Sequence, residues 1–184
     1  MTLRIVADRV IADAAAAFGG ILIYIMVRFT FKFAVGSITA TLHDVLVIMG
    51  FFSISRMEFD LNALAAVLAI MGYSLNDTIV ILDRVRENFR NMRKADPVTI
   101  VNSSLNQTLA RTINTSVVTL LSVLALLFFG GEMIRSFSIA LTIGIVVGTY
   151  SSIYVASAMV LALGATRQEL LPMQKEGAAV DNRP

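Results

Sequence analysis

A carboxylate lies inside one apolar run and a guanidinium lies at the edge of another, where charge is costly. Asp77 lies in a run that begins at Leu61, and Arg111 precedes a later run that ends at Phe129. A charged side chain in hydrocarbon costs about 2.5–3.5 kcal/mol on insertion scales, so such residues are by default hypotheses for functional sites. The alternative is structural, with Asn76 and Asp77 only joining neighbouring helices by hydrogen bonds. The sequence favours the functional interpretation and leaves the structural one open.

Helical rise predicts that these two charges lie at one level of the membrane. At 1.5 Å per residue, Asp77 lies about 24 Å from Leu61, and Arg111 lies about 27 Å from Phe129. We therefore expect them to lie close to the same membrane face and within reach of one another in at least one state. A proton on Asp77 would cancel its attraction to Arg111 and change how the helices pack.

Arg111 belongs to a stripe of polar side chains. Spacings of three and four residues place its members on one helix face: Thr108, Arg111, Thr115, Thr119 and Ser122. Such hydroxyls either bond back to carbonyls of their own helix or line a hydrated path. The arginine at the base of the stripe favours the hydrated path.

His43 and Asp44 form a second ionisable pair, about 15–17 Å into another apolar run and so near the middle of the membrane. A histidine exchanges a proton near neutral pH, and an adjacent aspartate would extend the polar path as a relay. Adjacent helical residues point about 100° apart, however, so the two cannot simply face one partner. A packed histidine with a polar neighbour on another helix is the favoured interpretation.

The last apolar run carries small residues at a constant spacing of four: Ala140, Gly144, Gly148, Ser152 and Ala156. Small residues on one helix face allow two backbones to approach closely. The pattern predicts a packing surface against another helix, either of this chain or of a partner subunit.

Composition places most of the chain in lipid. Of 184 residues, 57% are hydrophobic and only 15% charged, which lies outside the range of soluble globular domains. The apolar residues form runs near the ~20 residues needed to cross the hydrocarbon. We predict an all-α polytopic membrane protein with five transmembrane helices, at about 11–27, 33–54, 61–82, 112–129 and 134–163. The last run is long enough to tilt, kink or project past the bilayer.

Polar segments separate or flank these runs. We expect residues 1–10 to form an extracytoplasmic stub, residues 83–111 a cytoplasmic loop and residues 165–184 a disordered cytoplasmic tail. Within the loop, Asp96 and Pro97 are typical of a helix start. A short helix over 98–109 would lie along the membrane surface, with a plain solvated connector as the alternative.

Several kinds of chemistry are excluded. The chain has no cysteine and one histidine, so thiolate chemistry and a multi-histidine metal site are impossible. Neither Gly19-Gly20 nor Gly130-Gly131 is followed by the lysine of a nucleotide-binding loop, and no nucleophile elbow is present. We expect no catalytic residue, metal or cofactor, and a net charge of +2 is too small to indicate a nucleic-acid partner. If the chain performs work, ion movement must supply the energy.

Several segments together resemble the SecF family of protein-export membrane subunits, within the RND superfamily. Gly-Tyr-Ser-Leu-Asn-Asp-Thr from Gly72 is followed by Asp-Arg-Val-Arg-Glu-Asn from Asp83. Arg28-Phe29, His43-Asp44 and the segment 104–116 agree in order and spacing. The resemblance covers nearly the whole chain from Ile11 to Gly164.

The resemblance implies one RND-like transmembrane half-bundle that pairs with SecD and associates with the SecYEG channel and other Sec accessory subunits. Such a subunit uses the proton-motive force to promote export of polypeptides across the bacterial cytoplasmic (inner) membrane. By motif, Asp77 and Arg111 match the family's intramembrane pair. The resemblance places them, with the adjacent Asn76, in a proton-responsive site that an aspartate of SecD completes.

The family also has one more N-terminal span and a folded extracytoplasmic domain, so we expect residues 1–10 to correspond to the end of that domain. Two alternative functions remain: an RND-type exporter of small hydrophobic molecules, and a passive translocon scaffold. The short cytoplasmic loop and the Asn-Asp-Thr context argue against the exporter.

Basic residues gather in alternate loops, which predicts the orientation. One set of loops holds Arg28, Lys32, Arg84, Arg86, Arg90, Arg93, Lys94, Arg111, Arg167, Lys175 and Arg183, and the other only Arg4, Arg9, Arg56 and Arg135. The positive-inside rule makes the first set cytoplasmic, with the N-terminus outside and the C-terminus inside.

This orientation can be tested because the chain contains no cysteine. In intact cells, an impermeant thiol reagent should label a Glu132→Cys variant and leave a Lys94→Cys variant unlabelled. Labelling at position 94 instead would invert the topology.

Overall fold

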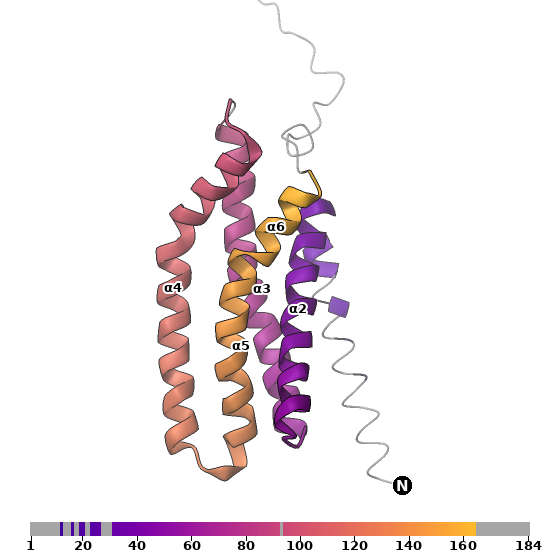
Figure 1. Cartoon of the computed structure of the whole chain (residues 1–184), viewed down its shortest axis with the longest axis vertical. Helices are drawn as coiled ribbons and strands as arrows, with labels where there is room; N and C mark the ends of the chain where they lie inside the picture. Colours follow the sequence, from indigo (N-terminus) through magenta and orange to yellow (C-terminus); the bar gives the residue numbers. More distant parts are fainter. Residues whose placement is uncertain are drawn as a thin grey trace, which may run out of the picture.

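The computed structural model describes residues 31–92 and 94–164, together with residues 12, 16, 19, 20 and 23–26. The elements of this part of the chain are α2 (Phe31–Ser55), α3 (Leu61–Asn91), α4 (Pro97–Phe129), the 3-10 turn η1 (Glu132–Ile134), α5 (Arg135–Ile153) and α6 (Val155–Ala162), shown in Figure 1. Four helical segments are long and apolar enough to cross a membrane. The predicted all-α polytopic membrane fold is confirmed for the described residues. The predicted span at 11–27 lies mostly outside them, and the segments 1–10 and 165–184 lie wholly outside.

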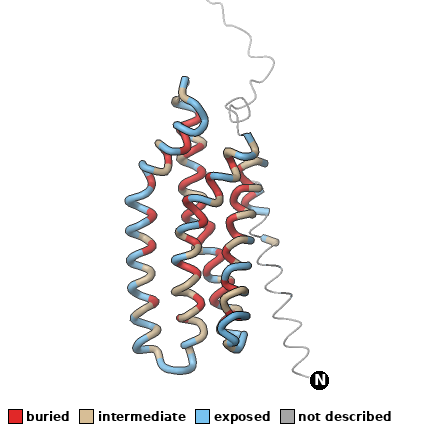
Figure 2. Tube along the Cα trace, in the orientation of Figure 1, coloured by how far each residue is buried: buried red, intermediate tan, exposed pale blue. Residues whose placement is uncertain are grey.

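The helices α2, α3, α4 and α5 stand side by side, each antiparallel to the one before it, and α6 continues from α5 toward the same end (Figure 1). The connections α2–α3 and α4–α5 lie at one end, while the α3–α4 connection, the start of α2 and the end of α6 lie at the other. α3 packs against α2, α4 and α5. In the most apolar window of α3, 50% of the residues are buried, against 17% for α4. Figure 2 accordingly shows an exposed side along α4, so this helix has an open face.

Residues 83–111, expected to form a loop, are mostly helical. α3 continues to Asn91 and α4 already begins at Pro97, so only a short connection separates them. The helix expected along the membrane surface over 98–109 is instead the first part of α4. Residues 98–109 continue alongside α3 because Ile100 and Val101 are buried in one cluster with Val85 and Phe89 of that helix. Apolar burial between the two helices thus extends the hairpin past the most apolar parts of both.

The line of small residues on α5 and α6 packs against helices of this chain. All five are buried: Ala140, Gly144, Gly148, Ser152 and Ala156. A Cβ atom at Gly144 would overlap the Ile70 side chain of α3, and one at Gly148 would lie 3.2 Å from the Ser74 Cβ atom. The Ala156 carbonyl oxygen lies similarly close, 3.2 Å from a Cβ built at Gly36 of α2. These small residues therefore let α5 pack closely against α3, and α6 against α2.

The long last run is interrupted at Tyr154, which separates α5 from α6. Figure 1 shows that the chain changes direction there and leans toward α2. Of the three accommodations expected for this run, the described residues thus show a kink. The interruption redirects the small-residue face from α3 toward α2.

We expect Gly148→Leu to destabilise the bundle, because the larger side chain would force α5 away from Ser74 on α3. Overpacking usually costs about 1–3 kcal/mol. The matched control is Gly72→Leu, since nothing lies within 4 Å of a Cβ built at Gly72. The accumulation and thermal melting of the two purified variants should differ clearly. Equal behaviour would mean that α5 does not pack closely on α3.

Candidate functional site

Asp77 is buried in the bundle without a bonding partner. It is 4% exposed, and its Oδ2 atom has no hydrogen-bond partner. Arg111 on α4 lies near enough for its positive charge to act on the Asp77 carboxylate, but no direct ion pair joins the two side chains. Arg111 is itself exposed on α4. The structure therefore brings the Asp77 carboxylate and the Arg111 guanidinium near enough to attract one another, without a direct contact between them.

Hydrogen bonds between α3 and α4 fix the level of Asp77. The Tyr73 hydroxyl donates to Ser116 Oγ at 3.1 Å, and Asn88 Nδ2 donates to Ser104 Oγ at 2.8 Å. Because α3 and α4 are antiparallel, this register sets Asp77 opposite Thr112. The predicted match in depth between Asp77 and Arg111 agrees with the same register.

Buried oxygen atoms without partners gather at this level. They are Oδ2 of Asp77, Oγ1 of Thr78 and Oγ1 of Thr112. Buried polar atoms in proteins nearly always have partners, protein or water. Three unsatisfied oxygens within about one turn of the α3–α4 register favour a position that receives water or changes its contacts.

Asn76 is exposed on α3. Adjacent positions on a helix point about 100° apart, and Asp77 is the one that points into the core. Within this chain, the structure does not bring Asn76 into the group around Asp77.

The hydroxyls of the predicted stripe on α4 bond to their own helix. Thr115 Oγ1 donates to the Arg111 carbonyl at 3.1 Å, and Thr119 Oγ1 donates to the Thr115 carbonyl at 2.8 Å. Thr108 and Ser122 do the same with the carbonyls four residues before them. This geometry is the alternative in which such hydroxyls satisfy themselves, so the described chain gives no support to a path along these residues.

A neighbouring line on α4 faces the core instead, and the sequence analysis missed it. Its buried members are Ser104, Thr108, Thr112 and Ser116, at a constant spacing of four. Ser116 Oγ receives hydrogen bonds from the Tyr73 hydroxyl of α3 and, at 2.7 Å, from Thr149 Oγ1 of α5. One hydroxyl thus joins three helices. The spacing of four could have predicted this buried face from the sequence, as it predicted the packing face of the small residues on α5.

His43 and Asp44 do contact one another. The histidine folds back so that Nδ1 lies 3.3 Å from Asp44 Oδ1, and Ser74 Oγ of α3 donates to Asp44 Oδ2 at 2.5 Å. Asp44 is fully buried, whereas the His43 side chain is 37% exposed. These contacts differ from the favoured interpretation, a packed histidine with a polar neighbour on another helix: the aspartate makes the interhelical contact and the histidine bonds to the aspartate.

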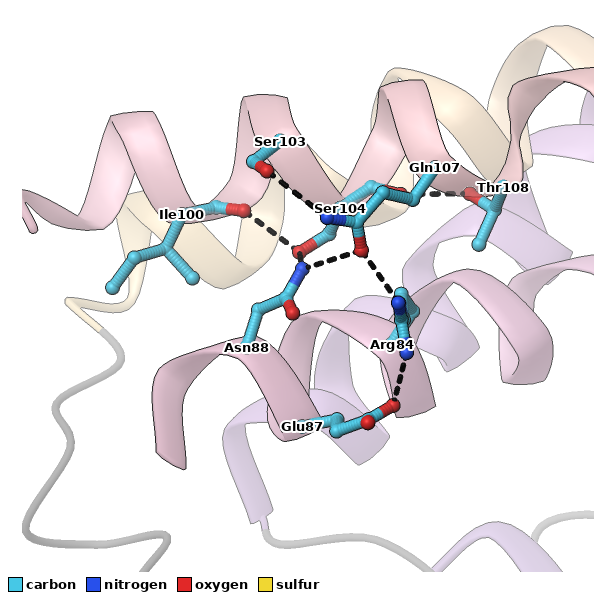
Figure 3. Close-up of polar contacts among 8 residues, drawn as sticks. All are labelled: Arg84, Glu87, Asn88, Ile100, Ser103, Ser104, Gln107 and Thr108. Atoms are coloured by element: carbon cyan, nitrogen blue, oxygen red, sulfur yellow. Dashed lines mark hydrogen bonds and ion pairs between the residues drawn. The ribbon is translucent and has the colours of Figure 1, made fainter. Parts of the chain in front are cut away.

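A network of polar side chains joins α3 to α4 near the connection between these two helices, as Figure 3 shows. Gln107 Oε1 accepts from Arg84 Nε at 2.6 Å and from Asn88 Nδ2 at 3.0 Å. Arg84 also pairs with Glu87 at 2.5 Å. A cavity of about 350 Å³ lies between these groups and Arg111, with Asp83, Arg84, Gln107 and Thr108 among its lining residues. The Arg111 side of the site is therefore in contact with a polar space at this end of the bundle.

Within the described residues, no three His, Asp or Glu side chains are placed to hold a metal ion. The groups around Asp77 are the Arg111 guanidinium and the hydroxyls of Thr78 and Thr112; of these side chains, the carboxylate is the one that can accept and release a proton.

Comparison with known proteins identifies a family. Residues 4–166 match the family model described as protein export membrane protein SecD/SecF, C-terminal. The chain is 56% identical over 168 residues to protein translocase subunit SecF of Pseudomonas aeruginosa, which covers 91% of this chain and 55% of that protein. For the subunit of Vibrio alginolyticus the identity is 52% over 166 residues, covering 89% and 53%. The chain spans about half the length of these curated relatives.

Solved structures agree. The crystal structure of SecDF from Thermus thermophilus, described as a translocon-associated membrane protein, matches with a TM-score of 0.76 and 51% identity, over 79% of this chain and 20% of that one. SecDF in a super-membrane-facing form matches with a TM-score of 0.75, the same identity and the same coverage.

We expect Asn88→Ala to loosen the α3–α4 hairpin, because it removes two hydrogen bonds between the helices, while the Ser104 hydroxyl keeps its bond to the Ile100 carbonyl. A hydrogen bond contributes about 0.5–1.5 kcal/mol to stability. Asn102→Ala, at an exposed position of α4, is the matched control. Denaturation of both variants in one detergent should separate them, and equal midpoints would show that the network does not hold the hairpin.

Proposed function

Because the chain belongs to the SecD/SecF C-terminal family of protein-export membrane proteins, we propose that it is a SecF-type subunit that couples proton movement to protein export across the bacterial inner membrane. The observation that carries this proposal is the buried Asp77 carboxylate, which lacks a bonded partner while the charge of Arg111 acts on it. Asp77 and Arg111 are the groups that respond to the proton.

The electrostatics of the pair link protonation to helix packing. An ionised Asp77 draws Arg111 toward the core, since opposite charges attract strongly where water is scarce. A protonated Asp77 is neutral and releases Arg111 to other acceptors. Each protonation state thus favours a different position of α4 against α3, which is the differential interaction that any coupled conformational change requires.

The open face of α4 supports a partner half-bundle. Arg111 is exposed there, and facing lipid it would cost about 2.5–3.5 kcal/mol. A second membrane half that covers this face and presents a carboxylate would remove that cost. SecD is the partner proposed, since the similar solved structures are of SecDF. Association with the SecYEG channel and other Sec subunits, and contact with exported polypeptide, belong to the same proposal.

The positions of the basic residues support the orientation. Lys32, Arg84, Arg86, Arg90 and Lys94 belong to the end that holds the α3–α4 connection, whereas Arg56 and Arg135 belong to the other end. The first end is proposed to be cytoplasmic. This arrangement puts the cavity beside Arg111 on the cytoplasmic side.

A passive scaffold, in which Asp77 and Arg111 only bridge helices, is less well supported. A buried structural bridge needs close geometry to offset desolvation of both charges, and this pair makes no direct contact. An exporter of small hydrophobic molecules draws no support from the comparisons, which name protein-export subunits.

We expect Asp77→Asn to abolish proton-driven export while the protein still accumulates and assembles with its partner, because asparagine keeps the size but cannot ionise. Arg111→Lys keeps the charge but loses the planar fork, and should be impaired as well. The readout is translocation into inverted membrane vesicles with and without an imposed proton gradient.

The control is Glu132→Gln, which removes only an exposed ion pair with Arg135. Exposed ion pairs contribute little to protein stability. Full gradient-dependent translocation by Asp77→Asn at normal protein level would assign the aspartate a structural role and favour the passive scaffold.

A further inference from the structure

Asp44 is a second buried acid that the Asp77–Arg111 pair does not use. It is 0% exposed in the middle of α2, and it is held from α3 by the Ser74 hydroxyl at 2.5 Å. On the α5 side it meets Gly148, where a Cβ atom would lie 3.6 Å from Asp44 Oδ2. The glycine therefore lets α5 close over this carboxylate without bringing a charged or polar side chain to it.

His43 is the one group that can balance the charge of Asp44. In the part of the chain that the structure describes, no lysine or arginine forms an ion pair with Asp44, and His43 Nδ1 lies 3.3 Å from Oδ1. Across α3 the facing polar group is the neutral Ser74, with Asp77 one turn further on, and α5 presents Gly148. Among the described residues, the imidazole of His43 is therefore the group placed to act as counter-ion to an ionised Asp44.

One proton makes this pair neutral in either of two arrangements. The proton lies on the imidazole beside an ionised Asp44, or on Asp44 beside a neutral imidazole. Without that proton the fully buried Asp44 carboxylate would have no counter-charge beside it, which is costly where water is scarce. The pair is therefore an arrangement in which one proton balances the charge.

Such an acceptor is near on α3. Ser74 bonds to Asp44, and Asp77 follows three residues later, about 4.5 Å along the helix axis and on the same side of it. The Oδ2 atom of Asp77 has no partner. At the other end of the line, the His43 side chain is 37% exposed on α2, so it is accessible from outside the described helices. The groups lie in the order His43, Asp44, Ser74 and Asp77.

We propose that His43 and Asp44 form a second proton-binding site that holds one proton in mid-membrane and exchanges it with Asp77 past Ser74. In this step Asp44 gives its proton to the Ser74 oxygen, and the hydroxyl passes its own proton to a water molecule. The water passes a proton to Asp77, which becomes a neutral carboxyl group. His43 then takes a proton at the α2 surface and restores the neutral pair. The inference rests on the proposed role of Asp77.

Three substitutions separate proton binding from packing. His43→Asn keeps an N–H donor near the position of Nδ1 but cannot take up a proton. His43→Arg supplies a permanent positive charge that fixes Asp44 in its ionised form. Asp44→Asn keeps the shape and still accepts the Ser74 hydrogen bond. A role limited to hydrogen bonding would be satisfied by His43→Asn, and a role limited to charge pairing by His43→Arg.

The test uses inverted vesicles that contain the complete export complex, with translocation measured against pH under an imposed proton gradient. We expect all three variants to lose most gradient-driven translocation and to lose the wild-type pH dependence, at wild-type protein levels. Leu46→Ala, at a 70% exposed position on α2, is the control and should be unchanged. An unchanged pH profile in His43→Asn or in His43→Arg would overturn the proposal.

Ser74→Ala provides a second test if the His43 and Asp44 variants fail to accumulate, because this substitution changes no charge. Translocation several-fold slower at normal protein level is expected, and a wild-type rate would remove Ser74 from the path and overturn the proposal. Asp77→Asn in the same vesicles separates the two hypotheses. Full activity of Asp77→Asn contradicts the proposed function itself, whereas loss with Asp77→Asn and full activity of the His43 and Asp44 variants contradicts only this inference.

Discussion

The close approach of α5 to α3 is the constraint on which the other polar contacts depend. In lipid the hydrophobic effect does not drive helices together, so van der Waals packing and interhelical hydrogen bonds must do so. Gly144 accepts the Ile70 side chain, and one turn later Gly148 lies against Ser74. That second contact holds Ser74 where its hydroxyl reaches Asp44 of α2. A larger residue at either glycine would separate three helices, because α2 is tied to α3 at the point where α5 closes over it.

α3 makes hydrogen bonds to α2 and to α4, whereas its contact with α5 is close packing. Tyr73 bonds to α4 and Ser74 to α2, while Arg84 and Asn88 bond to α4 again near the end of the hairpin. Asp77 lies between these two groups of bonds and is the member without a partner. The helix is therefore fastened on both sides of its acid, so a change of charge at Asp77 acts on a short segment whose ends are held. A local shift of α4 beside Arg111 is the movement that this arrangement leaves available.

The sequence predicted what depends on residue type and spacing along one helix. Long apolar runs gave the membrane fold, and the glycines at spacing four indicated a packing face that the structure places against α3 and α2. The helix ends predicted on either side of residues 83–111 were wrong, because burial of Ile100 and Val101 against α3 extends α4 beyond its apolar part. From the sequence we selected the hydroxyl line of Thr115 and missed that of Ser116, because only tertiary packing decides that Ser116 faces the core while Thr115 bonds to its own helix. The contact of His43 with Asp44 depends on side-chain torsions, which helical periodicity does not specify.

The two acids of the half-bundle differ in how their charge is balanced. Asp44 has its counter-ion next to it on the same helix and is enclosed by α3 and α5, so its neutral state is complete within this chain. The counter-ion of Asp77 lies on α4, does not touch it, and is exposed on the open face of that helix. An arginine so placed can be shared between Asp77 and an acceptor outside the chain, since its planar fork binds oxygens on more than one side. Charge balance at Asp77 therefore depends on what covers α4, whereas charge balance at Asp44 does not. The two acids therefore differ in where their charge is balanced: at Asp44 by a residue of the same helix, and at Asp77 by an arginine on the open face of α4.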